Sequence, residues 1–324
     1  MHRVVLSDFP MIEPETYREI LTDAIGDSVS ITVAELGSTA NLIDAAADAD
    51  VVVTDINTPV TAEALGQLSV RGVVRSAVGV DNIDVGAAAK HDVTVTRVPD
   101  YCTNEVATHS VSLLLAAARS LKRYDTAVTA GGWSWEDGRP IRRISASTIG
   151  LLSFGPIARR AAAQLAGFDA DLIAYDPFVD ADEMAEHGVE KVEFDSLFDR
   201  ADHVGVYAPL TDATRGMVDA DALDRLDEHS VLVNVGRGPV VETDALRAAL
   251  ESGRIKGAAL DVLAQEPPED DSLVGRDDTI VTPHAAWYSE DARDDLNRSA
   301  AADVAAILTG STPSGRVDPE ADWL

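Results

Sequence analysis

Short β-rich apolar runs alternate along the first part of the chain with segments in which apolar residues recur at helical spacing. The runs are Val4–Leu6, Ile31–Val33, Val51–Val53, Val73–Val74 and Val93–Val95, and the helical segments between them are Tyr17–Ile25, Leu42–Ala49, Ala62–Leu68 and Val85–Lys90. Strands that alternate with helices in this way are typical of a parallel sheet whose faces are covered by helices. The pattern therefore predicts one α/β domain in this part.

The same alternation returns after a long predicted helix that begins near Thr103. That helix carries one apolar stripe, made of Ala107, Val111, Leu114, Ala118 and Leu121. The predicted strands that follow it are Ile149–Leu152, Asp171–Tyr175, Asp202–Tyr207, Ser230–Val235, Gly257–Asp261 and Thr279–Val281, and a last helix runs from Ser289 to about Leu308. We expect an α/β protein with two doubly wound parallel-sheet domains, the second of Rossmann type.

The segment from Thr148 to Pro177 has the order strand, glycine turn, helix, strand, acid that is typical of a dinucleotide-binding unit. Gly155, Pro156 and Ile157 begin its helix, where free N–H groups hold a pyrophosphate. Asp176 ends the second strand, where a carboxylate accepts the hydroxyls of the adenosine ribose and repels a 2′-phosphate, so NAD is expected over NADP. Ser153 stands where the fingerprint has its first glycine, and alanine in the third position is a common variant.

Each later strand ends in residues suited to a cleft. Ligands of doubly wound folds bind beyond the carboxyl ends of the strands, so these segments are expected to meet over the cofactor. The segments are Tyr207-Ala208-Pro209 with Thr214, Asn234-Val235-Gly236-Arg237, Asp261-Val262 and Thr282-Pro283-His284.

Composition limits the possible functions. A chain of 324 residues exceeds one usual hydrophobic core and fits two domains. No apolar run approaches the roughly 20 residues of a membrane span, and the start of the chain has no signal-peptide pattern, so a cytoplasmic protein is expected. Cys102 is the only cysteine, which predicts no disulfide and no cysteine-based metal site.

Charge is the unusual property, because 56 acidic against 26 basic residues give a formal net charge of −30. Such a field repels nucleic acids and anionic membranes, so neither is expected as a partner. The acids are spread along the whole chain, as in the run Asp180-Ala-Asp-Glu183, rather than gathered in a tail. This distribution indicates adaptation to a salt-rich cytoplasm, where salt screens the self-repulsion.

Arg237, Glu266 and His284 lie far apart in the sequence but all follow strands of the same predicted sheet. Each alone is compatible with a turn, a loop acid or a helix cap. Together they supply what the reduction of a 2-oxo acid by hydride requires: a cation that grips the carboxylate, an imidazole that gives the oxygen its proton, and a carboxylate that orients the imidazole.

On these motifs the chain resembles the D-isomer-specific 2-hydroxyacid dehydrogenases. The resemblance extends from Val78-Gly79-Val-Asp-Asn-Ile-Asp84 through Asn234-Val-Gly-Arg-Gly238 and Ala259-Leu-Asp-Val262 to Thr282-Pro-His284. Within the family, Tyr101-Cys-Thr-Asn-Glu-Val and Pro283-His-Ala-Ala-Trp-Tyr-Ser289 are most similar to the branch that holds the C-terminal-binding proteins and phosphoglycerate dehydrogenase.

The resemblance implies Arg237 as substrate binder, His284 as acid/base and Glu266 as its partner. It places Asp261 near the nicotinamide amide and the backbone of Val78 and Gly79 at the substrate carboxylate, and it implies Thr108 among the cofactor contacts. It further implies a homodimer, and a flavodoxin-like substrate domain built from 1–98 and 285–324 around a Rossmann domain of 99–284.

Three alternatives remain open at this point. The branch includes dinucleotide-sensing, corepressor-like scaffolds with little turnover, although the complete trio favours an enzyme. The arm Gly131-Gly-Trp133-Ser-Trp135 is either a packed loop or a subunit contact, and its aromatic content favours the contact. Trp287 is either core or a wall of the substrate pocket that favours apolar over phosphorylated 2-oxo acids.

Overall fold

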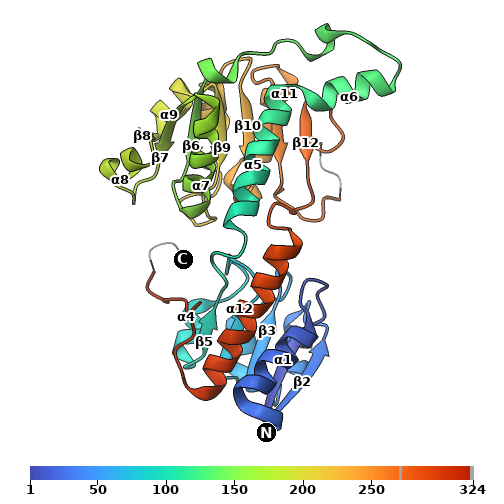
Figure 1. Ribbon diagram of the computed structural model, residues 1–324, viewed down its shortest axis with the longest axis vertical. Coiled ribbons are helices and arrows are strands. Elements are labelled where there is room, and N and C mark those ends of the chain that lie inside the picture. The colour runs from blue at the N-terminus through green and yellow to red at the C-terminus, as the bar shows by residue number, and fades with distance from the viewer. Residues whose placement is uncertain (270–271, 322–324) are drawn as a thin grey trace. The chain divides into compact units, whose positions relative to one another are not determined.

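The computed structural model describes residues 1–269 and 272–321, and residues 270–271 and 322–324 lie outside this description. Its contacts divide the chain into two compact units. The first is Met1–Cys102 together with Ser289–Leu324, and the second is Thr103–Tyr288 (Figure 1). The chain thus leaves the first unit once and returns to it.

The first unit is a five-stranded parallel sheet in the order β2-β1-β3-β4-β5. Its strands are β1 His2–Ser7, β2 Val29–Ala34, β3 Val51–Thr54, β4 Gly72–Arg75 and β5 Thr94–Thr96. Its helices are α1 Pro14–Ile25, α2 Thr39–Ala45, α3 Ala62–Gln67, α4 Val85–Lys90 and α12 Glu290–Thr309. Helix α12 packs against α1 and the sheet, which explains how the C-terminal segment belongs to this unit. Asp84 caps α4 by accepting from the Ala87 N–H.

The second unit is a seven-stranded parallel sheet in the order β12-β11-β10-β9-β6-β7-β8. The strands are β6 Thr148–Leu152, β7 Asp171–Tyr175, β8 Glu190–Lys191, β9 His203–Val206, β10 Val231–Asn234, β11 Gly257–Leu260 and β12 Thr279–Val281. The order reverses between β6 and β9, which is the switch point of a doubly wound sheet, where ligands bind. The predicted fold class, two parallel-sheet α/β domains, is confirmed.

Seven α-helices surround this second sheet within the described residues. They are α5 Thr103–Ala118, α6 Leu121–Thr129, α7 Pro156–Leu165, α8 Ala181–Glu186, α9 Phe194–Arg200, α10 Ala220–Asp224 and α11 Thr243–Glu251. Short 3-10 turns occur at Gly26–Ser28, Trp135–Gly138, Ile144–Ala146, Ala166–Phe168 and Gly238–Val240. Helices α5 and α7 lie side by side against the sheet (Figure 1).

The long helix from Thr103 ends earlier than its stripe predicts. It stops at Ala118, and Ser120 takes a left-handed φ of 56°, so the chain changes direction before α6. Leu121 is consequently 55% exposed and does not share the buried stripe, so its placement there was wrong. The Ser120 hydroxyl donates to the Gly138 carbonyl oxygen at 2.9 Å, which fixes the return of the arm toward β6.

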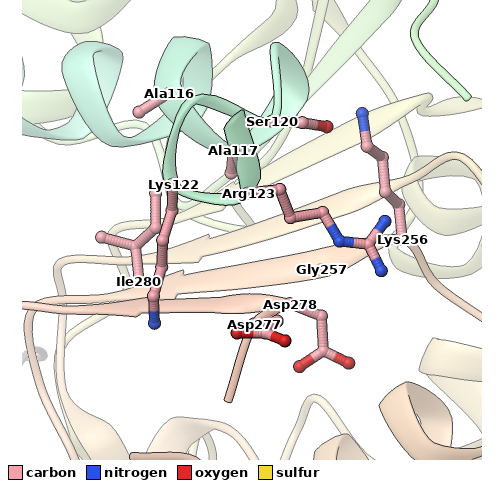
Figure 2. Close-up of a pocket in the computed structure, with 10 residues that line it drawn as sticks. All are labelled: Ala116, Ala117, Ser120, Lys122, Arg123, Lys256, Gly257, Asp277, Asp278 and Ile280. Atoms are coloured by element: carbon pink, nitrogen blue, oxygen red, sulfur yellow. The ribbon is translucent and has the colours of Figure 1, made fainter. Parts of the chain in front are cut away.

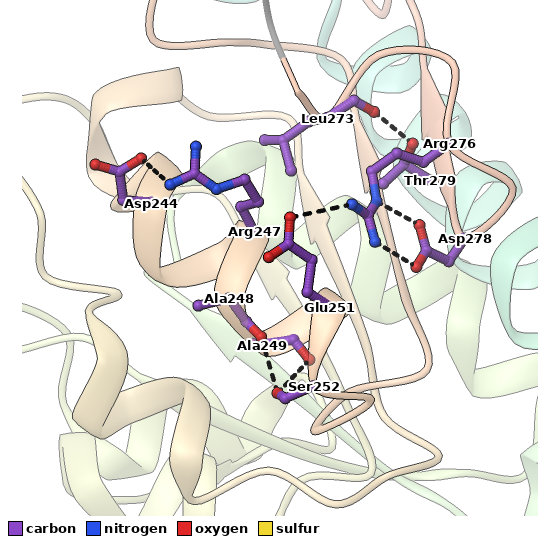
Figure 3. Close-up of polar contacts among 10 residues, drawn as sticks. All are labelled: Asp244, Arg247, Ala248, Ala249, Glu251, Ser252, Leu273, Arg276, Asp278 and Thr279. Atoms are coloured by element: carbon purple, nitrogen blue, oxygen red, sulfur yellow. Dashed lines mark hydrogen bonds and ion pairs between the residues drawn. The ribbon is translucent and has the colours of Figure 1, made fainter.

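Several arginines of the second unit are paired with acidic residues. Arg276 donates to Asp278 at 2.7 Å and lies 3.9 Å from Glu251, while Arg247 pairs with Asp244 at 2.8 Å (Figure 3). An exposed pair such as Arg247 with Asp244 contributes only about 0–1 kcal/mol, whereas Arg276 and Asp278 are partly buried. Because acids outnumber bases two to one overall, such pairs leave most of the negative charge uncompensated.

Among the described helices, none has the length and apolar character needed to cross a bilayer.

Candidate active site

The predicted catalytic residues follow three neighbouring strands of the second unit. Arg237 comes after β10, Glu266 lies on the loop between β11 and β12, and His284 follows β12. These parallel strands end at the same edge of the sheet, so their loops are brought together there.

His284 and Glu266 are in direct contact. The Nδ1 atom of the imidazole lies 2.6 Å from Oε2 of the carboxylate, and the other carboxylate oxygen accepts the Leu263 N–H at 2.8 Å. Partial burial raises the pKa of Glu266, but the hydrogen bond and charge of His284, the Leu263 N–H and the charge of Arg237 outweigh it and hold the pKa below its usual value. Glu266 is therefore an anion that orients the ring and leaves Nε2 available for proton transfer.

Arg237 is held on a turn that its neighbours define. Asn234, the last residue of β10, donates to the Arg237 carbonyl oxygen at 3.0 Å and accepts the Gly236 N–H at 3.0 Å. A Cβ at Gly238 would lie 2.0 Å from the backbone of Leu263, so only glycine allows this turn to pack against the loop that carries Glu266. This packing explains why the charge of Arg237 acts on Glu266.

The backbone of His284 lies in the left-handed region, with φ of 52°. Asp261, at the end of β11 and 2% exposed, holds this conformation. Its carbonyl oxygen accepts the His284 N–H at 2.8 Å, and its carboxylate accepts the N–H groups of Ala285 and Ala286, each at 2.9 Å. A non-glycine residue in this region costs about 1–3 kcal/mol, and such strain is found where surrounding contacts fix it.

Two further residues belong to this network: Thr282, which was predicted among the residues suited to a cleft, and His109, which was missed in the sequence. The Thr282 hydroxyl donates to Asp261 Oδ1 at 2.6 Å, and His109 Nε2, from α5, lies 3.0 Å from that hydroxyl and 3.6 Å from Asp261 Oδ1. Nothing in the sequence links His109 to a residue 173 positions away. The predicted contact of Asp261 with the cofactor stays a prediction, whereas its contacts with the loop that carries His284 are observed.

The turn between β6 and α7 has the features that a pyrophosphate needs. Gly155 is the N-cap of α7, and a Cβ built on it would meet no atom within 4 Å, so no other segment packs against the backbone at this position. The N–H groups of the first helical turn are those that hold a pyrophosphate. Asp176, 6% exposed, ends β7 and accepts the Phe154 N–H at 2.8 Å through Oδ2 and the Phe178 N–H at 2.9 Å through Oδ1. The residues at this turn therefore fit an adenine dinucleotide.

The remaining predicted cofactor residues lie at the same edge or on α5. Thr108 is on α5, and the residues after β9 and β10 are Tyr207, Ala208, Pro209, Thr214, Val235 and Gly236; the cofactor contacts of all seven stay predictions. Burial raises the pKa of Tyr207 to about 12, and its hydroxyl lies 2.7 Å from that of Ser110. Thr214 donates to the Pro209 carbonyl oxygen at 2.6 Å, which closes the loop after β9.

Two predicted substrate residues are on segments outside this sheet. Val78 and Gly79 follow β4 of the first unit, where the Val78 carbonyl oxygen accepts from Arg97 at 3.3 Å. Trp287 is half-buried and makes an edge-to-face contact with Tyr288 at 5.4 Å between ring centroids. Their roles toward substrate stay predictions.

A separate small pocket lies at the amino ends of β11 and β12, away from the predicted catalytic residues (Figure 2). Lys122, Arg123 and Lys256 line it together with Asp277 and Asp278. The ammonium groups of both lysines bind backbone carbonyl oxygens, those of Arg276 and Thr279 for Lys122 and that of Ala118 for Lys256. These cations therefore tie α5 and α6 to the sheet and do not converge on one ligand.

Comparison with known proteins assigns the second unit. Residues 111–286 match the family model described as "D-isomer specific 2-hydroxyacid dehydrogenase, NAD binding domain". The chain is 34% identical over 310 residues to a D-3-phosphoglycerate dehydrogenase of Mycobacterium leprae, covering 93% of this chain and 58% of the relative. It is 34% identical over 284 residues to a glyoxylate reductase of Korarchaeum cryptofilum, covering 86% of each. The chain thus spans little more than half the length of the phosphoglycerate dehydrogenases that it matches.

Solved structures agree on the fold. The chain superposes with a TM-score of 0.86 on the D-lactate dehydrogenase of Aquifex aeolicus, solved with NAD and lactic acid, at 24% identity and over 95% of this chain and 96% of that one. From the family model and the relatives, the chain belongs to the D-isomer-specific 2-hydroxyacid dehydrogenase family. Its seven-stranded unit contains the NAD-binding domain of that family, and the predicted resemblance is confirmed.

Proposed function

We propose that this protein is an NAD-dependent oxidoreductase that interconverts a 2-oxo acid and a D-2-hydroxy acid. The observation that carries the proposal is the hydrogen-bonded pair of His284 and Glu266, with Arg237 beside it, at the carboxyl edge of the NAD-binding unit. A dinucleotide-sensing scaffold would not require this arrangement. Because both the trio and its supporting contacts are complete, turnover is favoured over sensing alone.

Each side chain has a defined task in this proposal. Arg237 pairs with the substrate carboxylate and polarises the 2-oxo group, and the backbone N–H groups near Val78 and Gly79 assist in holding the carboxylate. His284 gives its proton from Nε2 to the carbonyl oxygen during reduction and takes it back in the reverse direction. Glu266 orients the imidazole and stabilises its charged form. NADH, when bound, supplies the hydride to the carbon.

The turn between β6 and α7, together with Asp176, explains the choice of NAD over NADP. The N–H groups at the start of α7, beside Gly155, Pro156 and Ile157, bind the pyrophosphate. Asp176 accepts a ribose hydroxyl and repels the 2′-phosphate of NADP. We further propose that Asp261, Thr108, Thr214 and the segments Tyr207–Pro209 and Val235–Gly236 line the rest of the dinucleotide site, and that 1–98 with 285–324 form the substrate domain around 99–284.

We propose a substrate with an apolar or thioether side chain rather than a phosphorylated one. The net charge of −30 disfavours a second anionic group, and Trp287 offers an apolar surface three residues after His284. One relative, matched over 86% of both chains, is a glyoxylate reductase, and the acid in that name is unphosphorylated. Phosphohydroxypyruvate is accordingly expected to be a poor substrate.

We also propose a homodimer joined through the arm between α6 and β6, in a cytoplasm rich in salt. Trp133 and Trp135 are 90% and 70% exposed, and Leu121 and Val128 on α6 are 55% and 49% exposed, so the arm and α6 together expose four large apolar side chains. Such surfaces are typical of subunit contacts. Molar salt would screen the repulsion between two chains that each carry −30.

The test is a panel of 2-oxo acids followed by NADH absorbance, in low and in molar KCl. At least one unphosphorylated acid is expected to be reduced to the D-hydroxy acid, and His284→Ala and Arg237→Ala are each expected to lower kcat/KM at least 100-fold while the Kd for NADH changes less than about threefold. No turnover with any acid, at NADH concentrations that saturate the protein, would favour the scaffold instead.

A further inference from the structure

Ser153 occupies the tight turn of the dinucleotide unit with a backbone conformation that favours glycine. Its φ is 76°, and its N–H donates to the Tyr175 carbonyl oxygen at 2.8 Å. A side chain in this left-handed region is disfavoured relative to glycine by roughly 1 kcal/mol. A serine here therefore needs a compensating contact.

The compensating contact is with Asp176. The Ser153 hydroxyl donates to Asp176 Oδ2 at 3.1 Å, and the same oxygen accepts the Phe154 N–H at 2.8 Å. The Phe178 N–H donates to Oδ1 at 2.9 Å. A carboxylate offers about four acceptor positions, so three protein donors leave about one of them for a ligand.

The adenosine ribose presents two hydroxyl donors, at the 2′ and 3′ positions, to this single remaining position. We propose that Ser153 is an affinity-setting residue of the dinucleotide site, because its hydroxyl competes with the ribose for Asp176. The inference rests on the proposed function, since it requires that this turn binds NAD(H). The second ribose hydroxyl must either displace the Ser153 hydroxyl from Asp176 or make no hydrogen bond to Asp176. Either outcome weakens the binding of NADH.

Two variants separate the hydroxyl from the backbone. Ser153→Ala removes the competing donor and keeps the Cβ, and Ser153→Gly also removes the backbone strain. We expect the Kd for NADH, measured by titration calorimetry, to fall about 3- to 10-fold in Ser153→Ala and at least as much in Ser153→Gly. A gain of affinity is a result that damage to the fold does not produce. Ser252→Ala, at the exposed end of α11, is the matched control and is expected to bind NADH as the unchanged protein does.

A second experiment removes the ribose hydroxyls from the ligand. An NADH analogue whose adenosine lacks the 2′- and 3′-hydroxyls is expected to bind the unchanged protein and Ser153→Ala with equal affinity, because it has no donor for the released position. The role of Ser153 is overturned if both variants bind NADH no more tightly than the unchanged protein does. It is also overturned if Ser153→Ala gains as much affinity for the analogue as for NADH. In either case, turnover by the unchanged protein leaves the proposed function in place. Failure of the unchanged protein to bind NADH at all overturns the proposed function and this inference with it.

Discussion

Glu266 and His284 are joined by a hydrogen bond of 2.6 Å although 18 residues separate them in the sequence. Each sits on a loop that follows one of two adjacent parallel strands, β11 and β12, so the pairing of those strands sets the distance between the two side chains. The sheet therefore brings the two loops together, and bonds within the loops, from the Leu263 N–H to Glu266 and from Ala285 and Ala286 to Asp261, hold the proposed acid/base and its partner in place.

Glu266→Gln tests this relationship. The amide keeps the shape but removes the negative charge that favours a protonated His284, so we expect kcat for 2-oxo acid reduction to fall about 10²- to 10⁴-fold with the Kd for NADH nearly unchanged. The pH above which reduction declines should also move downward. A pH–rate profile with kcat measured at saturating NADH checks both, and an unchanged profile would assign Glu266 a purely structural role.

Thr282→Val tests the network around Asp261. The variant is close in size to threonine but removes the hydroxyl that lies between Asp261 and His109, so the strained loop that carries His284 loses one of its fixing contacts. We expect kcat to fall about 10-fold or more, because small displacements of a reacting group are costly, while NADH affinity stays within about twofold. Thr309→Val removes an exposed hydroxyl at the end of α12 and serves as the control. A kcat equal to that of the control would show that the remaining bonds to Asp261 suffice.

The sequence predicted the features that depend on local pattern. Strands such as β7 and helices such as α4 were placed at the bounds found in the structure, because apolar periodicity and caps act over a few residues. Ser120 shows where this fails: its left-handed φ ends α5, and no neighbouring residue signals it. The bond between Ser153 and Asp176 and the contact of His109 with Thr282 depend on tertiary packing between distant segments, which one sequence does not reveal.

His203 predicts how stability depends on pH. Burial lowers its pKa from 6.5 to about 4, with smaller lowering effects of His229 and Lys256 against a raising effect of Asp202. The folded protein thus keeps the ring neutral, and its Nδ1 accepts the Val231 N–H at 3.3 Å, whereas the unfolded chain takes up a proton below pH 6.5. Stability is fully present above pH 6.5 and declines as pH falls toward 4, by about 3 kcal/mol for this group.

Denaturant unfolding between pH 7.5 and 4.5 measures this effect. His203→Asn is expected to be less stable at pH 7.5 but to show a flatter decline, because the titrating group is gone. His91→Gln, at an exposed position, should follow the unchanged protein. If the free energy of unfolding falls equally with pH in all three proteins, the carboxylates alone cause the loss of stability in acid.

Salt should stabilise the fold over a wide range. Because the chain carries a net charge of −30, repulsion between carboxylates opposes folding in dilute buffer, and a Debye length of about 3 Å at 1 M salt removes most of it. We expect the Tm to rise by more than about 10 °C between 0.05 and 2 M KCl, and activity to return when salt is restored. Melting temperatures that agree within error at both concentrations would contradict the proposed salt adaptation.

Trp287 bears on which 2-oxo acid fits, because it follows His284 by three residues and is only half-buried. Asp261 accepts the N–H groups of Ala285 and Ala286, so the backbone immediately before Trp287 is held in place. Large aromatic side chains next to a reacting group define the shape of what binds there. We expect Trp287→Ala to change the ranking of kcat/KM among apolar 2-oxo acids about 10-fold or more and to leave the Kd for NADH within about twofold. Trp133→Ala, on the exposed arm, removes the same side chain elsewhere and should leave the ranking unchanged. If both variants keep the original ranking, Trp287 packs within its own unit and the side-chain preference arises from other residues.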